Sequence, residues 1–181
     1  AISMKTSENE RKRMRFYGGE VDGPSRQLAR YIDKLTDLYM TNIDAIMIYR
    51  LDRFGRGGHH RPFNDEGFTG VRIMETHENY TRQHQDIRVE NGVKYGDVIE
   101  GVNFEYAAKL TAVNSLTLAA LASAPLAPEN VMIAGAVQPF TRLKWEAVED
   151  ENLIGYKIYW RDTTSPVWQY SRFVGTVTDY T

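Results

Sequence analysis

The sequence predicts an α/β domain followed by an all-β segment. Two helical patterns flank two short apolar runs in the first two thirds of the chain, as in a sheet that is buried on both faces by helices. Beyond about residue 129, apolar and polar residues alternate with a period of two, which indicates strands. The proline-containing stretch 123–128 lies between the two patterns and is the clearest predicted linker.

The α/β part is predicted to span residues 18–122, after a charged arm or truncated helix at 1–17. Apolar residues at helical spacing predict a helix over 25–41, with Ser25 as its N-cap. The nearly continuous apolar run 45–49 predicts a strand that is buried on both faces, and 71–75 is predicted as a second short strand, with a glycine-rich loop between the two. A long polar loop is expected over 76–101, and an alanine-rich helix with a wide apolar face over 103–121.

The β part, residues 129–181, is predicted to contain short antiparallel strands at 130–134, 141–146, 155–161 and 168–174. This pattern is typical of a β-sandwich, and Trp145 and Tyr156 are expected in its core. About fifty-five residues are few for two closed sheets, so we expect this domain to be partial.

Composition and charge narrow the classes of function to be expected. The formal net charge is -2, which gives no reason to expect nucleic acid or an anionic membrane as partner. No apolar run approaches the roughly 20 residues that span a bilayer. Cysteine is absent, so disulfides and thiolate metal ligands are excluded.

All the histidines lie close together in the sequence: His59, His60, His77 and His84. Imidazole nitrogens and nearby carboxylates suit zinc, so this clustering is compatible with a metal site. However, there is no HExxH motif, and two adjacent histidines cannot easily face one ion from regular structure. On spacing alone, exposed loop histidines with one or two structural ones are the favoured interpretation.

Two blocks of sequence carry a more specific signal. The stretch Tyr49–Phe68, YRLDRFGRGGHHRPFNDEGF, resembles the twenty-eighth metallopeptidase family, the co-catalytic zinc aminopeptidases related to glutaminyl cyclases. Glu78-Asn79-Tyr80 with Gln83–Asp97, QHQDIRVENGVKYGD, is similar to one bacterial branch of that family. The resemblance covers about residues 18–121. The tail from Pro128 resembles the opening strands of a fibronectin-type-III-like module.

The resemblance implies a three-layer α/β/α sandwich with a mixed sheet, of which this chain would contain the C-terminal part. It also implies two zinc ions, held by histidines and carboxylates, and hydrolysis of N-terminal peptide bonds in peptides or proteins. Most of those ligands are expected in segments before Ala1, so the chain alone is expected to be inactive. The family further implies a secreted or periplasmic protein.

The resemblance assigns tentative roles to two residues. His60 matches a histidine near the metal ions, although the family has Asp-His where this sequence has His59-His60. The last histidine ligand of the family stands four residues before an aspartate, and counting back from Asp86 gives Arg82. His84 is then the candidate zinc ligand, provided that the loop shifts.

Three interpretations of function follow from these observations. The first is a zinc aminopeptidase. The second is a catalytically dead relative that binds without hydrolysis, because His59 and Arg82 depart from the family pattern. The third is an unrelated sugar- or protein-binding module in which the β-rich tail is the active part.

Overall fold

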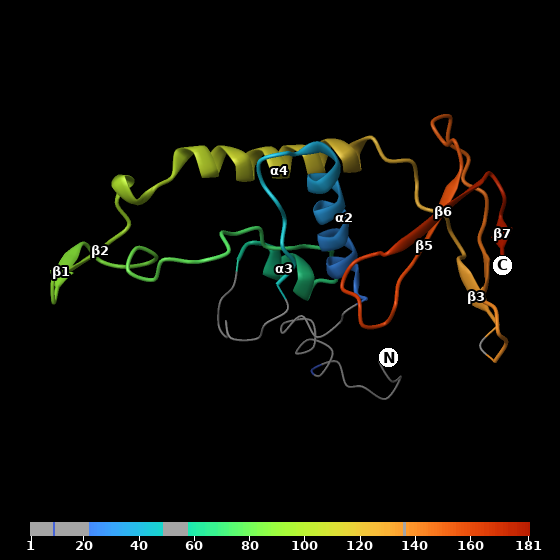
Figure 1. Ribbon diagram of the computed structural model, residues 1–181, viewed down its shortest axis with the longest axis horizontal. Coiled ribbons are helices and arrows are strands. Elements are labelled where there is room, and N and C mark those ends of the chain that lie inside the picture. Colours follow the sequence, from blue (N-terminus) through green and yellow to red (C-terminus); the bar gives the residue numbers. More distant parts are fainter. Residues whose placement is uncertain (1–8, 10–21, 49–57, 136) are drawn as a thin grey trace. The chain divides into compact units, whose positions relative to one another are not determined.

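The computed structural model describes residues 9, 22–48, 58–135 and 137–181 (Figure 1). The chain forms two compact units, Ala1–Leu118 and Ala119–Thr181. Apart from Asn9, the predicted arm at 1–17 lies outside the described residues. Among the helices of the described part, none has the length and apolar character needed to cross a membrane.

Helix α2 (Pro24–Tyr39) confirms the first predicted helix, with one correction at its start. Gly23 is the N-cap and Pro24 is the first helical residue, whereas Ser25 lies inside the first turn. Proline suits this position because its missing N–H would have no helical partner there. Ile32 and Leu35, one face of the helix, are buried and form the centre of the first unit.

The apolar runs predicted as strands at 45–49 and 71–75 are not strands in the part of the chain that the structure describes, which excludes Tyr49. Side chains of α2 bind the backbone around them instead. Arg26 Nη1 donates a hydrogen bond to the carbonyl of Ile48 (3.0 Å), and the Gly70 N–H donates to Ser25 Oγ (3.4 Å). The predicted burial is wrong as well, since none of the described residues 45–48 and 71–75 is buried and Ile46 is 65% exposed. A strand also needs a hydrogen-bonded neighbour, which the sequence of the segment itself does not specify.

The predicted loop 76–101 contains regular structure that composition did not reveal. Strands β1 (Arg88–Glu90) and β2 (Val93–Tyr95) form an antiparallel hairpin, and a 3-10 turn, η1 (Ile99–Gly101), follows. Asn91 and Gly92 connect the strands with φ values of 49° and 79°. Two consecutive positive φ angles are those of a tight hairpin turn, for which Asn-Gly is the strongest sequence signal.

We expect Gly92→Ala to destabilise this hairpin by about 1 kcal/mol, because a Cβ is unfavourable at positive φ. Nothing lies within 4 Å of the position that the added Cβ would occupy, so the cost is conformational and not steric. Amide hydrogen exchange in β2 should accelerate about fivefold. Lys94→Ala in the same strand is the control, and equal exchange rates in both variants would contradict the turn assignment.

Helix α4 (Phe104–Ala122) confirms the second predicted helix. Asn103 caps it by accepting a hydrogen bond from the Tyr106 N–H on Oδ1 (3.0 Å). Its burial is limited, since Val113 and Thr117 are its buried residues while Phe104 is 64% and Leu118 68% exposed. Coverage of a sheet by this helix therefore stays a prediction.

The second unit contains two small antiparallel sheets. One has the order β3-β4-β7, from β3 (Met132–Ala134), β4 (Arg142–Lys144) and β7 (Asp179–Tyr180). The other pairs β5 (Tyr156–Trp160) with β6 (Tyr170–Gly175). The four predicted strands are confirmed, and the two-residue β7, too short to show a period, was missed.

An aromatic pair packs between these two sheets. Trp145 follows β4 and is buried, and its ring contacts that of Tyr156 edge to face with centroids 5.2 Å apart. Tyr156 also accepts a hydrogen bond from the Val148 N–H on its hydroxyl (2.8 Å). Both residues thus lie where the sequence predicted core, while the fibronectin-like assignment stays a prediction.

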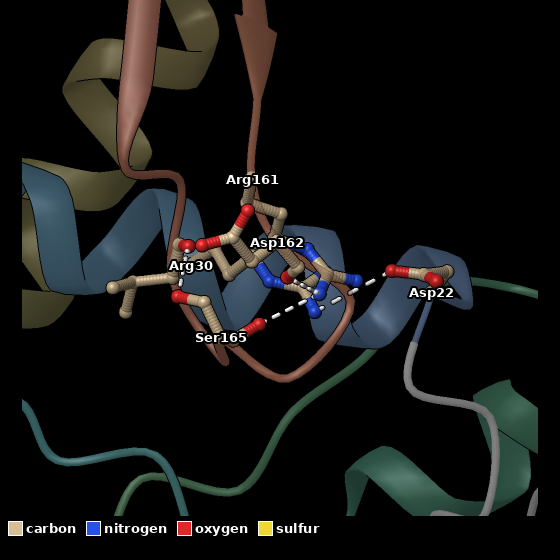
Figure 2. A network of polar contacts seen from close by, with 6 residues as sticks. Asp22, Arg30, Arg161, Asp162 and Ser165 are labelled. Atoms are coloured by element: carbon tan, nitrogen blue, oxygen red, sulfur yellow. Dashed lines mark hydrogen bonds and ion pairs between the residues drawn. The ribbon is translucent and has the colours of Figure 1, made fainter.

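Each unit has its own polar contacts, some of which Figure 2 shows. In the first unit, Arg30 of α2 forms an ion pair with Asp22 (3.5 Å), just before the helix begins. In the second unit, Arg161 Nη1 donates to the carbonyls of Ser165 (2.6 Å) and Asp162 (3.2 Å). These bonds fix the loop that connects β5 with β6.

Candidate functional site

A cavity of about 610 Å³ lies in the first unit, and we call it the His60 cavity. Helix α2, the segments 43–48 and 70–74, helix α3 (His60–Asp65) and helix α4 all contribute to its wall. Apolar side chains of the two segments and of α4 line it, among them Ile46, Ile48, Val71, Ile73 and Leu110. Polar and charged side chains also line it, namely Ser25, Arg26, Asp44, His60, Asn64, Arg72, Thr76 and Tyr106. An apolar cavity with a few polar groups is typical of a ligand site.

His60 is the first residue of α3 and is half-buried at this wall. Partial burial lowers the pKa of its imidazole, and the neighbouring guanidinium groups of Arg72 and Arg61 lower it further. Both causes disfavour the cationic form. The neutral ring is therefore the form expected at neutral pH, and it can both donate and accept a hydrogen bond.

This lowered pKa makes the stability of the first unit pH-dependent. As the pH falls below about 6.5, the ordinary pKa of histidine, the unfolded chain takes up a proton before the folded chain does. The free energy of unfolding should therefore decrease from about pH 6.5 downward, until the folded pKa is passed. Urea unfolding at pH 7.5 and pH 5 measures this loss, which we expect to be smaller in His60→Gln. An equal loss in both proteins would contradict the prediction.

A buried ion pair lies beside His60. Arg72 Nη2 is 3.1 Å from Glu78 Oε1, and the Glu78 side chain is only 3% exposed. Gln83 Nε2 donates a long hydrogen bond of 3.5 Å to the same oxygen. These contacts join the segment after Gly70 to residues 78–83. The sequence signal for this pair is Arg72 itself, a charged residue between Val71 and Ile73.

Gly70 is held from two helices. Its N–H donates to Ser25 Oγ of α2, and its carbonyl accepts from Asn64 Nδ2 of α3 at 3.2 Å. Asn64 Oδ1 is buried and has no hydrogen-bond partner. Sequence reasoning missed this contact as well, because Ser25 had been interpreted as a helix cap.

The four histidines are all described, and they differ in environment. His59, His77 and His84 are exposed, whereas His60 is half-buried and is the histidine that lines the cavity. His84 has a left-handed backbone, with φ of 53°, and its N–H donates to Asp97 Oδ2 (3.2 Å). The exposure of His59, His77 and His84 agrees with the interpretation that spacing alone favours, namely exposed loop histidines.

Arg82, which stands where the family pattern expects a ligand, packs against the η1 turn. Its Cδ, Nε and Cγ atoms lie 3.5, 3.6 and 3.8 Å from the position that a Cβ on Gly101 would occupy. The residue does not line the His60 cavity.

A zinc site does not fit the residues that the structure describes. No three His, Asp or Glu side chains in the described ranges form a group that could hold a metal ion. In addition, the arginines near His60 would repel a cation. Within the described ranges, neither His60 nor His84 is joined by the further ligands that a zinc centre needs.

Comparison with known proteins gives a consistent class of relatives. A probable zinc metalloprotease of Leptosphaeria maculans is 44% identical over 165 residues, which are 91% of this chain and 38% of that protein. A probable zinc metalloprotease of Pyrenophora tritici-repentis is 42% identical over 164 residues, 90% of this chain and 38% of its own length. One from Pyrenophora teres f. teres is 41% identical over 177 residues, 97% of this chain and 36% of that protein.

The chain is homologous to part of these fungal probable zinc metalloproteases. It spans little more than a third of the length of each. No protein-family model matches the chain, and no solved structure matches it.

Proposed function

We propose that this chain is the C-terminal part of the peptidase domain of a zinc-dependent aminopeptidase of the twenty-eighth metallopeptidase family. The proposal rests on one observation, an identity of 41–44% over nine tenths or more of the chain with proteins named probable zinc metalloproteases. The family blocks around His60 and around Gln83–Asp97 make the class more specific. The reaction is hydrolysis of the N-terminal bond of a peptide or protein.

In this proposal the chain contributes scaffold and not a complete metal centre. The peptidase domain of the longer protein is an α/β/α sandwich, and the described segments 45–48 and 71–74 of this chain line the His60 cavity. The zinc ligands come from the rest of the longer protein. The span of little more than a third of the length of the relatives supports this division.

We further propose that the second unit begins a fibronectin-type-III-like sandwich of a secreted or periplasmic protein. Its chain passes from β4 in one antiparallel sheet to β5 in another, and Trp145 packs on Tyr156 between them. Such a change of sheet is what a two-sheet sandwich requires.

The test is a comparison of two forms of one peptide, with a free or an acetylated N-terminus, on the longer protein that contains this chain. An aminopeptidase removes residues from the free peptide and leaves the acetylated one intact. Cleavage of the acetylated peptide at internal bonds would instead indicate an endopeptidase. The 181-residue chain alone should cleave neither peptide, and zinc-dependent release of an N-terminal residue by it would contradict the division of ligands.

The departures at positions 59 and 82 favour a second candidate, a catalytically dead relative that binds peptides. Here Arg82 replaces a zinc ligand, so the longer protein should bind no zinc at micromolar concentration in calorimetry. Arg82→His should then restore binding, whereas the matched control Arg61→His should not. Zinc binding by the unaltered protein would exclude this candidate.

A further inference from the structure

We propose that Gly58 and Gly70 are positioning residues for His60, since their lack of a side chain lets the histidine lie directly against the backbone at the wall of the His60 cavity. The inference deepens the proposed function and rests on it, because that function places His60 near the metal ions. It adds which residues hold the side chain there.

Gly58 leaves the space that the imidazole occupies. A Cβ on Gly58 would lie 2.8 Å from His60 Nδ1 and 3.0 Å from Cε1. Contacts this short are repulsive, since carbon atoms pack at about 3.5–4.0 Å. Any larger residue at position 58 must therefore move the ring away from its place.

Gly70 leaves space for the Cβ atom and the backbone of His60. A Cβ there would lie 3.2 Å from His60 Cβ, 3.4 Å from the His60 carbonyl oxygen and 3.0 Å from Asn64 Oδ1. Gly70 is not in the left-handed region, so space and not backbone conformation explains the glycine. Because Ser25 and Asn64 bind its N–H and carbonyl, its own position is fixed.

The same close packing brings Arg72 near the ring. Arg72 Cδ is 3.5 Å from the position of a Cβ on Gly58, and its guanidinium is held by the buried Glu78. Burial together with this neighbouring charge lowers the pKa of His60. The glycines thereby keep a neutral imidazole at the cavity, which is the form that can accept a proton or a hydrogen bond.

The first test is NMR of the His60 Cε1 proton in the 181-residue chain, with Gly58→Ala compared with the control Gly101→Ala. A Cβ on Gly101 would meet atoms of Arg82 at 3.5 Å or more, which is ordinary contact. We expect Gly58→Ala to shift the His60 signal and to raise its titration midpoint toward that of a solvated histidine. Gly101→Ala should change neither quantity.

The second test is a double-mutant cycle on the midpoint of thermal unfolding. Gly58→Ala should lower the midpoint in the natural sequence but add no further loss to His60→Ala, which lacks the Nδ1 and Cε1 atoms of the clash. If Gly58→Ala prevents folding, the double variant should fold. An unchanged His60 signal, or an equal loss in both backgrounds, would overturn the inference. Neither readout needs zinc or hydrolysis, so its failure is distinguishable from failure of the proposed peptidase function.

Discussion

Replacing Trp145 by alanine is expected to destabilise the second unit by about 3–4 kcal/mol, the usual cost of removing a buried tryptophan. Among the described residues of this unit, Trp145 is the one hydrophobic residue that is buried, with 9% of its surface exposed. Its ring contacts the ring of Tyr156 across the two sheets, and this contact is lost in the alanine variant. The backbone N–H of Trp145, which donates to the carbonyl of Thr178 (3.0 Å), is retained. The loss is comparable with the whole stability of a small unit.

Circular dichroism during guanidinium unfolding measures this loss, with Trp145→Phe as the matched variant. The indole Nε1 of Trp145 is buried without a hydrogen-bond partner, so phenylalanine gives up no hydrogen bond and retains the aromatic contact. We expect phenylalanine to cost about 1 kcal/mol, mainly for the smaller volume. Equal stability of the alanine variant and the natural chain would show that the two sheets do not share a core.

Arg72→Ala is expected to have the largest effect in the first unit, a loss of about 3 kcal/mol. The substitution removes the cation from a carboxylate whose side chain is only 3% exposed, while Arg72 itself is 29% exposed. The cost therefore comes mainly from removing the Arg72 charge beside the buried Glu78 carboxylate.

Urea unfolding of the first unit measures this effect, and the chain offers two useful comparisons. Arg88→Ala breaks a surface pair with Glu90 at the same distance of 3.1 Å, and it should cost less than 1 kcal/mol. The double variant Arg72→Met with Glu78→Leu removes both charges and should be less destabilised than Arg72→Ala alone. If Arg72→Ala costs no more than Arg88→Ala, the pair does not stabilise the fold.

Local sequence patterns predicted the two long helices, missed the short helix α3 (His60–Asp65), and predicted the remaining elements unevenly. The helices at 24–39 and 104–122 have apolar residues spaced over several turns, a signal contained within each segment. The hairpin at 88–95 was missed because the segment was judged by its polar composition and not by its Asn91-Gly92 turn. The segments 45–49 and 71–75 were wrongly predicted as buried strands, because both strand pairing and burial depend on residues elsewhere in the chain; in their described parts no residue is buried.

The candidate site also depends on contacts that local sequence patterns do not contain. Histidine spacing did not distinguish His60 from the exposed His59, His77 and His84, and only the family resemblance singled it out. The ion pair of Arg72 with Glu78 joins side chains six residues apart in the sequence, and no known motif predicts it. The role of Gly58 depends on contacts of a few ångströms, which a sequence pattern does not contain.

The most direct test of the central claim, a zinc-dependent peptidase, is metal removal and return in the longer protein that contains this chain. A chelator should abolish release of the N-terminal residue from a peptide, and added zinc should restore it while magnesium should not. Hydrolysis that continues unchanged after complete removal of zinc would contradict the claim, and so would a protein that binds no zinc and hydrolyses nothing.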